Sequence, residues 1–225
     1  MATKKVKVTE EVEIVSFKPT IITAMVELVG SSEYSQSRYL DAEEFPKLDK
    51  EKGDDYDERI WREKGWWSKN QNGQEVMYIP GMQVKNCLEN ISKYLGDKIA
   101  GKGNSTYPKH FKAGIMVSKP FQLTGNMIID GTTYPNRQIL KDYVSKEVSF
   151  PTTKSGNRVK TRSPIVHNWR AVGEINILDQ VITPKIFENY LIQAGWFTGL
   201  GRYRVGNGGS YGRFILGSIS FRNGM

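Results

Sequence analysis

The sequence of 225 residues predicts a single α+β domain with an antiparallel sheet. Apolar, β-branched or alternating segments typical of strands occur at 20–29, 121–124, 171–178 and 214–221. Helical spacing of apolar residues occurs at 77–95 and 184–194, in each case between two strand segments. The resulting order of strand, helix, two strands, helix and strand is that of ferredoxin-like and RNA-recognition-type domains.

The first strand is expected in two parts that are separated near Pro19. Val6 to Val15 alternates between apolar and polar residues, and Thr20 to Val29 is rich in β-branched residues. Gly30 and the serines that follow it end this strand.

An acidic, tryptophan-rich insertion is expected at about 38–76. Residues 41–63 hold ten acidic against five basic residues, which is typical of a solvated helix or loop. The alternative is a contact surface for a basic face of a neighbouring copy. Trp61, Trp66 and Trp67 predict a small satellite core, with a base-stacking platform as the alternative.

The first helix is predicted to begin around Met77 and to run to about Leu95, because apolar residues recur on one face and Gly96 is a stop signal. Its N-terminal amides, near Lys85, could bind a phosphate, or Pro80 and Gly81 could simply form a tight turn into the helix. Short strands follow at 114–117 and 121–124, with turns at 129–132 and 134–136.

A basic hairpin insertion is expected at about 137–170. This segment holds eight basic residues against two acidic ones, and residues 152–158 have the composition of a hairpin tip. Such an arm could lie along a phosphate backbone, where charge neutralisation releases counterions. The alternative is a plain solvated hairpin.

The last part of the chain is a helix, a glycine-rich loop and a strand. Thr183 and Pro184 fit an N-cap followed by proline at the first helical position. Residues 195–214 then hold seven glycines and three arginines. Glycine permits positive φ and close backbone approach, so this loop could present N–H groups to an anion, or be a turn with exposed arginines.

Composition favours an anionic partner, because the net charge is +8 and the pI is about 9.4. No apolar run is long enough to span a membrane and the basic N-terminus lacks a signal-peptide core, so we expect a cytoplasmic protein. With one cysteine, Cys87, and two histidines, we expect no disulfide, metal or cofactor. The segment Ala100 to Thr106 lacks the order of a phosphate-binding P-loop, which argues against ATP hydrolysis.

Two stretches resemble the RAMP superfamily, the RNA-binding backbone proteins of CRISPR effector complexes. Residues 78–86, Tyr-Ile-Pro-Gly-Met-Gln-Val-Lys-Asn, are similar to its helix start, although Met82, Gln83 and Asn86 replace its usual small residues. Residues 199–214 are similar to its C-terminal glycine-rich loop. The resemblance implies a RAMP-like fold over most of the chain and a stand-alone relative of the kind that bacteriophages carry.

The resemblance also implies a shallow basic groove along a single strand, a hairpin that reaches over it, and head-to-tail copies. Candidate phosphate contacts are Lys85, Arg158, Lys160, Arg162, Arg202, Arg204 and Arg213. Tyr203 and Tyr211 could stack on bases or pack beneath the loop. Glycines expected to permit close backbone approach are Gly81, Gly199, Gly201, Gly208, Gly209 and Gly212.

We therefore expect a non-catalytic, largely sequence-independent protein that binds single-stranded RNA or DNA and oligomerises along the strand. The choice between RNA and DNA stays open, because backbone contacts alone do not read the 2′-hydroxyl. One alternative is an assembly protein that forms homo-oligomers without nucleic acid. Another is an RNA-processing endonuclease in which His167 or His110 acts as a general base.

Overall fold

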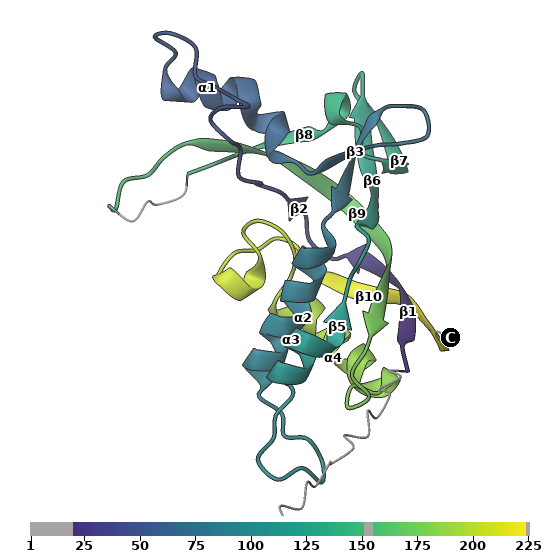
Figure 1. Ribbon diagram of the computed structural model, residues 1–225. Helices are drawn as coiled ribbons and strands as arrows, with labels where there is room; N and C mark the ends of the chain where they lie inside the picture. Colours follow the sequence, from purple (N-terminus) through teal and green to yellow (C-terminus); the bar gives the residue numbers. More distant parts are fainter. Residues whose placement is uncertain (1–19, 151–154, 224–225) are drawn as a thin grey trace, which may run out of the picture.

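The computed structural model describes residues 20–150 and 155–223, so the strand expected at 6–15 lies outside the described residues. An antiparallel sheet forms its centre, with the strand path β10-β1-β9-β6-β4-β3 (Figure 1). These strands are β10 (Phe214–Asn223), β1 (Ile22–Gly30), β9 (Thr161–Ile177), β6 (Phe121–Ile129), β4 (Glu75–Ile79) and β3 (Trp67–Lys69). Shorter strands at its margins are β2 (Tyr34–Ser35), β5 (Ile115–Met116), β7 (Thr132–Gln138) and β8 (Ser145–Ser149).

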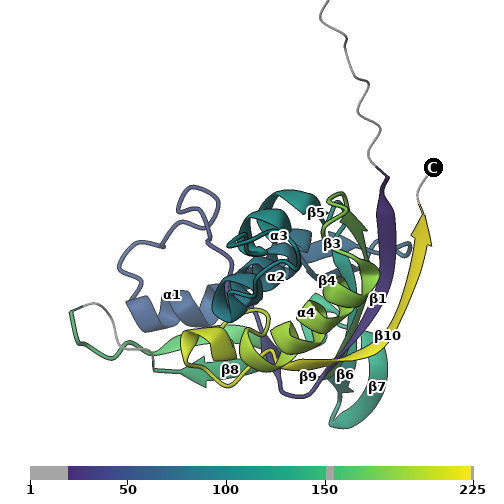
Figure 2. The same cartoon turned by 90° about the horizontal axis from the view of Figure 1, so that it is seen from below.

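Helices cover one face of this sheet, as Figure 2 shows for α2 (Gly81–Leu95), α3 (Pro108–Gly114) and α4 (Pro184–Phe197). Helix α1 (Gly53–Ile60) lies apart from them, near β8, and short 3₁₀ turns are η1 (Trp61–Lys64), η2 (Lys141–Tyr143) and η3 (Val205–Asn207). Alternate residues of β1, Ala24, Val26 and Leu28, are buried in the same core as Phe187 and Leu191 of α4. The predicted α+β class with an antiparallel sheet is confirmed.

Strand β9 joins the central sheet to a projecting arm. Its C-terminal half lies between β1 and β6, and its N-terminal half pairs with β8 from Ser145 opposite Ile165 to Ser149 opposite Thr161. The strand predicted at 171–178 is therefore only the second half of a 17-residue strand. Strands β8 and β9 pair antiparallel within the basic segment 137–170, and residues 151–154 of the expected hairpin tip lie outside the described residues. That this segment is a hairpin insertion stays a prediction.

Local signals in the sequence correctly predict the C-terminal end of α2 and the N-terminal end of α4. Helix α2 ends at Leu95, and Gly96 follows it with a left-handed φ of 61°. At the start of α4, the Thr183 Oγ1 accepts a hydrogen bond from the Ile186 N–H, and Pro184 occupies the first turn.

Three local predictions are wrong. Helix α3 was not expected, and the strand expected at 114–117 is only the pair Ile115–Met116 that follows α3. The segment Met77–Ile79 belongs to β4 rather than to the helix, because Tyr78 and Ile79 pair with β6. The turn expected at 134–136 lies inside β7, where residues 126 and 135–136 interrupt the register with β6.

Two of the three tryptophans of the acidic segment pack in the main core rather than in the small satellite core that was predicted. Trp61 is 5% exposed and belongs to the main core cluster, and Trp67 packs against it from a partly buried position. Trp66 packs on Tyr78, with ring centroids 6.3 Å apart.

The Gly-rich loop, residues 198–213, is held by backbone hydrogen bonds to itself and to the segment after β1. The Leu200 N–H donates to the Gly212 carbonyl at 2.9 Å, and the Gly212 N–H donates to the Glu33 carbonyl at 2.7 Å. The Arg202 N–H donates to the Ser35 carbonyl at 2.8 Å. The loop therefore has a fixed shape within the described structure.

Replacing Gly212 with alanine is expected to destabilise the protein strongly. Gly212 has a φ of +72°, and a Cβ atom there would lie 1.8 Å from the Leu200 carbonyl oxygen. Gly208→Ala is the matched control, because its φ is +78° but nothing lies within 4 Å of the added carbon. We expect a loss of unfolding free energy of about 1 to 2 kcal/mol for Gly208→Ala. For Gly212→Ala we expect roughly 3 kcal/mol or more in the same urea unfolding measurement. Equal losses would contradict this account of the loop.

Candidate nucleic-acid interface

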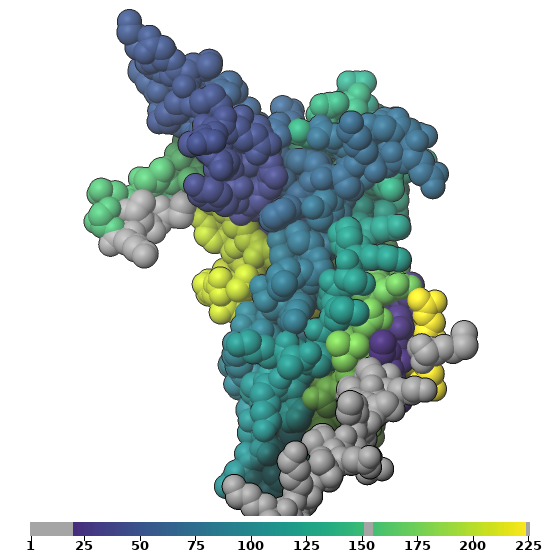
Figure 3. Space-filling model, in the orientation of Figure 1, coloured from purple at the N-terminus to yellow at the C-terminus, as the bar shows by residue number. Residues whose placement is uncertain are grey.

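The end of the β8–β9 hairpin and the Gly-rich loop project on the same side of the molecule. In Figure 3 the hairpin is the green projection and the loop is the yellow lobe below it, beside the surface of α2. Most of the cationic candidates belong to these two segments, so the fold brings the expected basic surface together.

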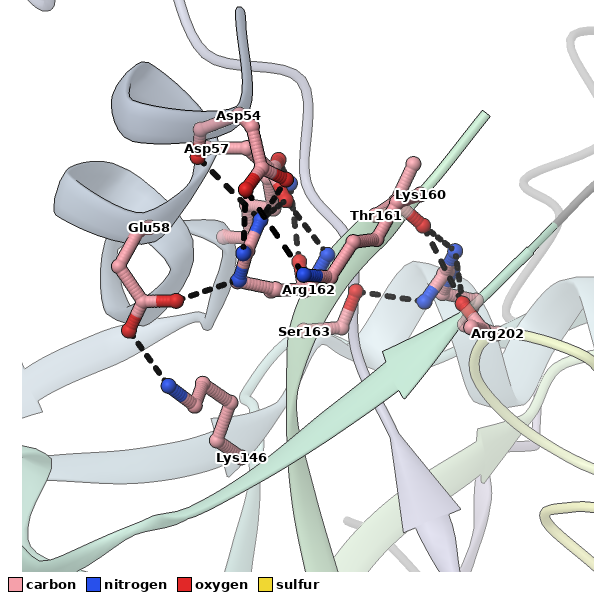
Figure 4. A network of polar contacts seen from close by, with 11 residues as sticks. Asp54, Asp57, Glu58, Lys146, Lys160, Thr161, Arg162, Ser163 and Arg202 are labelled. Carbon is pink, nitrogen blue, oxygen red and sulfur yellow. Dashed lines mark hydrogen bonds and ion pairs between the residues drawn. The ribbon is translucent and has the colours of Figure 1, made fainter. Parts of the chain in front are cut away.

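Arg202 lies at the junction of the loop and the hairpin and is held by neutral groups. Its Nη1 donates to the Ser163 Oγ at 2.6 Å, and its Nη2 donates to the Thr161 Oγ1 at 2.7 Å and to the Ser149 Oγ at 3.1 Å (Figure 4). The guanidinium carbon also lies 4.4 Å from the centre of the Tyr203 ring. Among the described residues no carboxylate forms an ion pair with it, so hydroxyl groups and a tyrosine ring, rather than an acid, position its charge.

Three further arginines of the two segments also lack an acidic partner. Within the described ranges, Arg158, Arg204 and Arg213 form no ion pair with a carboxylate. Arginines elsewhere in the fold often do, as shown by Arg38 with Glu44, Arg59 with Glu51, Arg170 with Glu27 and Arg222 with Glu174. Exposed Lys160 is intermediate, since its Nζ lies 3.7 Å from the Asp54 Oδ2. Four arginines at the loop and the hairpin end, Arg158, Arg202, Arg204 and Arg213, thus form no ion pair with a described carboxylate.

Arg162 has the opposite environment. Arg162 is 5% exposed, and its guanidinium lies 2.8 Å from the Asp54 Oδ1 and 2.5 Å from the Glu58 Oε2 (Figure 4). Its backbone N–H donates to the Asp57 Oδ2 at 2.6 Å. The hydrogen bonds to Asp54 raise the Arg162 pKa above its usual range, and the pKa of Asp54 is lowered in return. The expected phosphate contact at Arg162 is thus replaced by an internal ion cluster.

This ion cluster fixes the acidic segment on the hairpin of the same chain. The Lys146 Nζ on β8 lies 2.5 Å from the Glu58 Oε1, and its hydrogen bond lowers the pKa of Glu58. Lys64 pairs with Asp57 and also donates to the Arg162 carbonyl at 2.9 Å. These acids of α1 therefore act within the chain, whereas a role of the remaining acids in contacts between copies stays a prediction.

The two loop tyrosines already have partners inside the protein. The Tyr211 hydroxyl donates to the Glu147 Oε1 at 3.0 Å, and burial, with this hydrogen bond, raises the Tyr211 pKa to about 12. The Tyr203 ring lies edge-on to that of Tyr211, with centroids 6.4 Å apart, and Arg202 covers it. This arrangement favours packing within the loop over base stacking for both rings.

Most of the candidate glycines adjoin the chain's own backbone. Added Cβ atoms at Gly81, Gly199, Gly201, Gly209 and Gly212 would meet backbone oxygens at 1.8 to 3.2 Å. Gly208 instead faces open space. Approach of a ligand backbone to these glycines stays a prediction. Lys85 lies in α2, is half-buried and makes no ion pair with a described carboxylate.

The two histidines lie on different parts of the fold. The His110 Nδ1, on α3, lies 2.6 Å from the Asp179 Oδ2. Partial burial would raise the Asp179 pKa, but hydrogen bonds from the Val181 N–H and His110 outweigh it and lower that pKa. The His167 Nδ1 lies 3.9 Å from the Glu33 Oε1. His167 and Asp179 are separated by ten residues of β9, roughly 33 Å of extended strand, so the two histidines cannot act on one bond.

The hydroxyl groups that hold Arg202 were not among the residues predicted from the sequence. Thr161 and Ser163 occupy alternate positions on β9, so they share one face, and Ser149 lies directly opposite Thr161. A Thr-x-Ser pattern on one strand and a serine on its neighbour could have predicted this hydroxyl cluster only if the register between the two strands had been known.

In the parts of the chain that the structure covers, no helix is long and apolar enough to cross a membrane. Nor do those parts contain a group of three or more histidine, cysteine or acidic side chains that could hold a metal ion. The Cys87 thiol is buried, which raises its pKa to about 12.

Arg162→Met is expected to lower the unfolding midpoint and to loosen α1, because three acids then lose a shared cation. Lys160→Met is the matched control, since this exposed residue makes only one long contact with Asp54. Amide hydrogen exchange in 53–60 should accelerate in Arg162→Met and stay near the wild-type rate in Lys160→Met. Unchanged protection of α1 in both variants would show that the cluster does not hold the helix.

No protein-family model and no curated protein matches this sequence. Among solved structures, the fold is similar to a chain of the Type III-B Cmr-beta bound to cognate target RNA, with 16% identity, a TM-score of 0.44 and coverage of 91% of this chain and 61% of that chain. It is also similar to Cmr6 from Pyrococcus furiosus, with 12% identity, a TM-score of 0.44 and coverage of 87% and 98%. A third similarity is to a chain of a Type IV-B CRISPR complex, with 13% identity, a TM-score of 0.43 and coverage of 90% of each chain. All three TM-scores are below 0.5, so the functional conclusions depend on this chain's own residues.

Proposed function

We propose that this chain is a RAMP-like protein that binds single-stranded nucleic acid without catalysis, through the Gly-rich loop and the β8–β9 hairpin. The observation that carries this proposal is the environment of Arg202. A half-buried guanidinium held by three neutral hydroxyls, and by no described carboxylate, is positioned to bind an anion that comes from outside the chain. A phosphate of a nucleic-acid backbone meets this requirement.

The strand order supports the ferredoxin-like part of the proposal. The four strands β10-β1-β9-β6 are adjacent and antiparallel, α2 lies between β1 and β6 in the chain, and α4 lies between β9 and β10. This is the arrangement of two interleaved β-α-β units. Within this frame, segments 38–76 and 137–170 are the proposed insertions.

A single strand suits this surface because its cations come from two separate projections. Arg158 and Lys160 are exposed on the hairpin, and Arg204 and Arg213 belong to the loop. Side chains at such positions neutralise phosphates without reading base edges, so we infer binding that is largely independent of sequence. RNA and DNA both satisfy these contacts.

We propose no catalytic step. His110 is hydrogen-bonded to Asp179 beside α3, away from the hairpin, and His167 lies on β9 as a lone histidine. Among the residues that the structure describes, neither histidine forms a hydrogen bond or ion pair with a second histidine or a lysine that could share acid–base work on a phosphodiester.

We further propose that several copies bind side by side along one strand. The support is the opposite charge of two exposed segments of the same chain. Acids at 41–49 face solvent, and the hairpin end carries unbalanced cations. Neighbouring copies could bring these surfaces together. A stand-alone, phage-like role stays a prediction of the sequence resemblance.

The triple variant Arg158→Gln, Lys160→Gln and Arg213→Gln is expected to weaken binding to a labelled single strand. If each side chain contacts one phosphate, the slope of log K against log salt should fall by about 2, and the affinity at about 0.15 M salt should fall at least tenfold. The measurement is fluorescence anisotropy at several salt concentrations, with single strands and a duplex of equal length.

The matched control is Arg59→Gln, Arg170→Gln and Arg222→Gln, which removes the same net charge from arginines that already pair with carboxylates. This control should keep nearly wild-type affinity. Equal losses in the two triple variants would show that total charge, rather than this surface, determines binding.

A further inference from the structure

We propose that the groove between α2 and the Gly-rich loop holds a nucleobase of the bound strand, which stacks on the Tyr94–Phe197 ring pair. This inference rests on the proposed single-strand binding and adds a base-contacting subsite to it. Neither ring belongs to residues 78–86 or 199–214, the two stretches that resemble RAMP motifs.

The platform consists of two exposed, nearly parallel rings. Tyr94 near the end of α2 and Phe197 at the end of α4 lie with centroids 5.8 Å apart and planes inclined by 23°. Tyr94 is 71% exposed and Phe197 is 53% exposed. A third planar ring can therefore extend the stack from solvent, as bases do on aromatic side chains.

Polar groups surround the platform in a hollow of about 620 Å³, a volume typical of small-ligand sites. Asn90 precedes Tyr94 by one helical turn, and Asn207 belongs to η3 across the hollow. Carboxamides of this kind donate and accept hydrogen bonds at base edges. Arg204 completes the lining and makes no ion pair with any carboxylate in the described ranges.

The composition of this hollow favours a nucleobase over other occupants. Its lining combines two rings, two carboxamides and one arginine, and it contains no acidic side chain. A base supplies the π-face and the hydrogen-bonding edge, and its phosphate supplies the charge for Arg204.

The hollow adjoins the proposed backbone surface at Arg204. Arg204 also lines a smaller cavity of about 50 Å³ between α2 and the loop, together with Gln83, Asn86 and Gly201. Residues 83, 86, 90 and 94 recur along one face of α2, so a strand that passes Arg204 would run beside this face.

The test compares a labelled oligonucleotide with an abasic strand that has the same length and backbone charge. Wild-type protein should prefer the strand with bases by roughly 5- to 100-fold. The double variant Tyr94→Ala and Phe197→Ala should lose this preference and retain its affinity for the abasic strand. Trp196→Ala is the matched control, because this neighbouring ring is also exposed but lines a different hollow with Ile192 and Ile215.

A fluorescent 2-aminopurine base gives a second readout, because stacking quenches it. Quenching by wild-type and Trp196→Ala protein, but not by the double variant, is the expected result. Equal wild-type affinity for the two strands, or an unchanged preference in the double variant, would overturn the base subsite and leave backbone binding intact. Wild-type protein that binds neither strand would overturn the proposed function, and the subsite with it.

Discussion

The arrangement of the interface depends on strand β9, which pairs with other strands along both of its halves. Its C-terminal half is fixed between β1 and β6 in the central sheet, and its N-terminal half carries β8 beyond the sheet. Between the two halves, Trp169 is fully buried, and its Nε1 donates to the Ser32 carbonyl at 2.7 Å. Trp169 also packs on Tyr34, with ring centroids 5.3 Å apart. Because β9 forms hydrogen bonds both with the central strands and with β8, the hairpin and the core cannot shift independently of each other.

Two arginines near the start of β9 show how neighbours determine the role of a cation. Arg162 is surrounded by acids of α1 and stabilises the attachment of that helix. Arg202 reaches the same strand from the loop but meets the hydroxyls of Ser149, Thr161 and Ser163, which orient it and leave its charge unbalanced. Acids of α1 thus pair with Arg162, whereas neutral hydroxyls hold Arg202.

Local signals in the sequence predicted the elements whose ends depend on nearby residues. The C-terminal end of α2 follows from its apolar stripe and Gly96, and the start of α4 follows from the Thr183 cap. The full length of β9, the strand β4 and the burial of Arg162 could not be predicted, because each depends on partners far away in the chain. The hydroxyl groups around Arg202 and the Tyr94–Phe197 pair could not be predicted from the sequence either, because each joins elements that only the fold brings together.

The most direct test of the central claim is a titration of wild-type protein with labelled single-stranded RNA, single-stranded DNA and duplex of equal length, with the mass of each complex measured by light scattering. Salt-sensitive binding is expected to be tighter for a single strand than for the duplex, and the complex mass should grow as the strand is lengthened. Tighter binding to the duplex, or no binding of any of the three near physiological salt, would contradict the central claim. In the second case the remaining role would be assembly without nucleic acid.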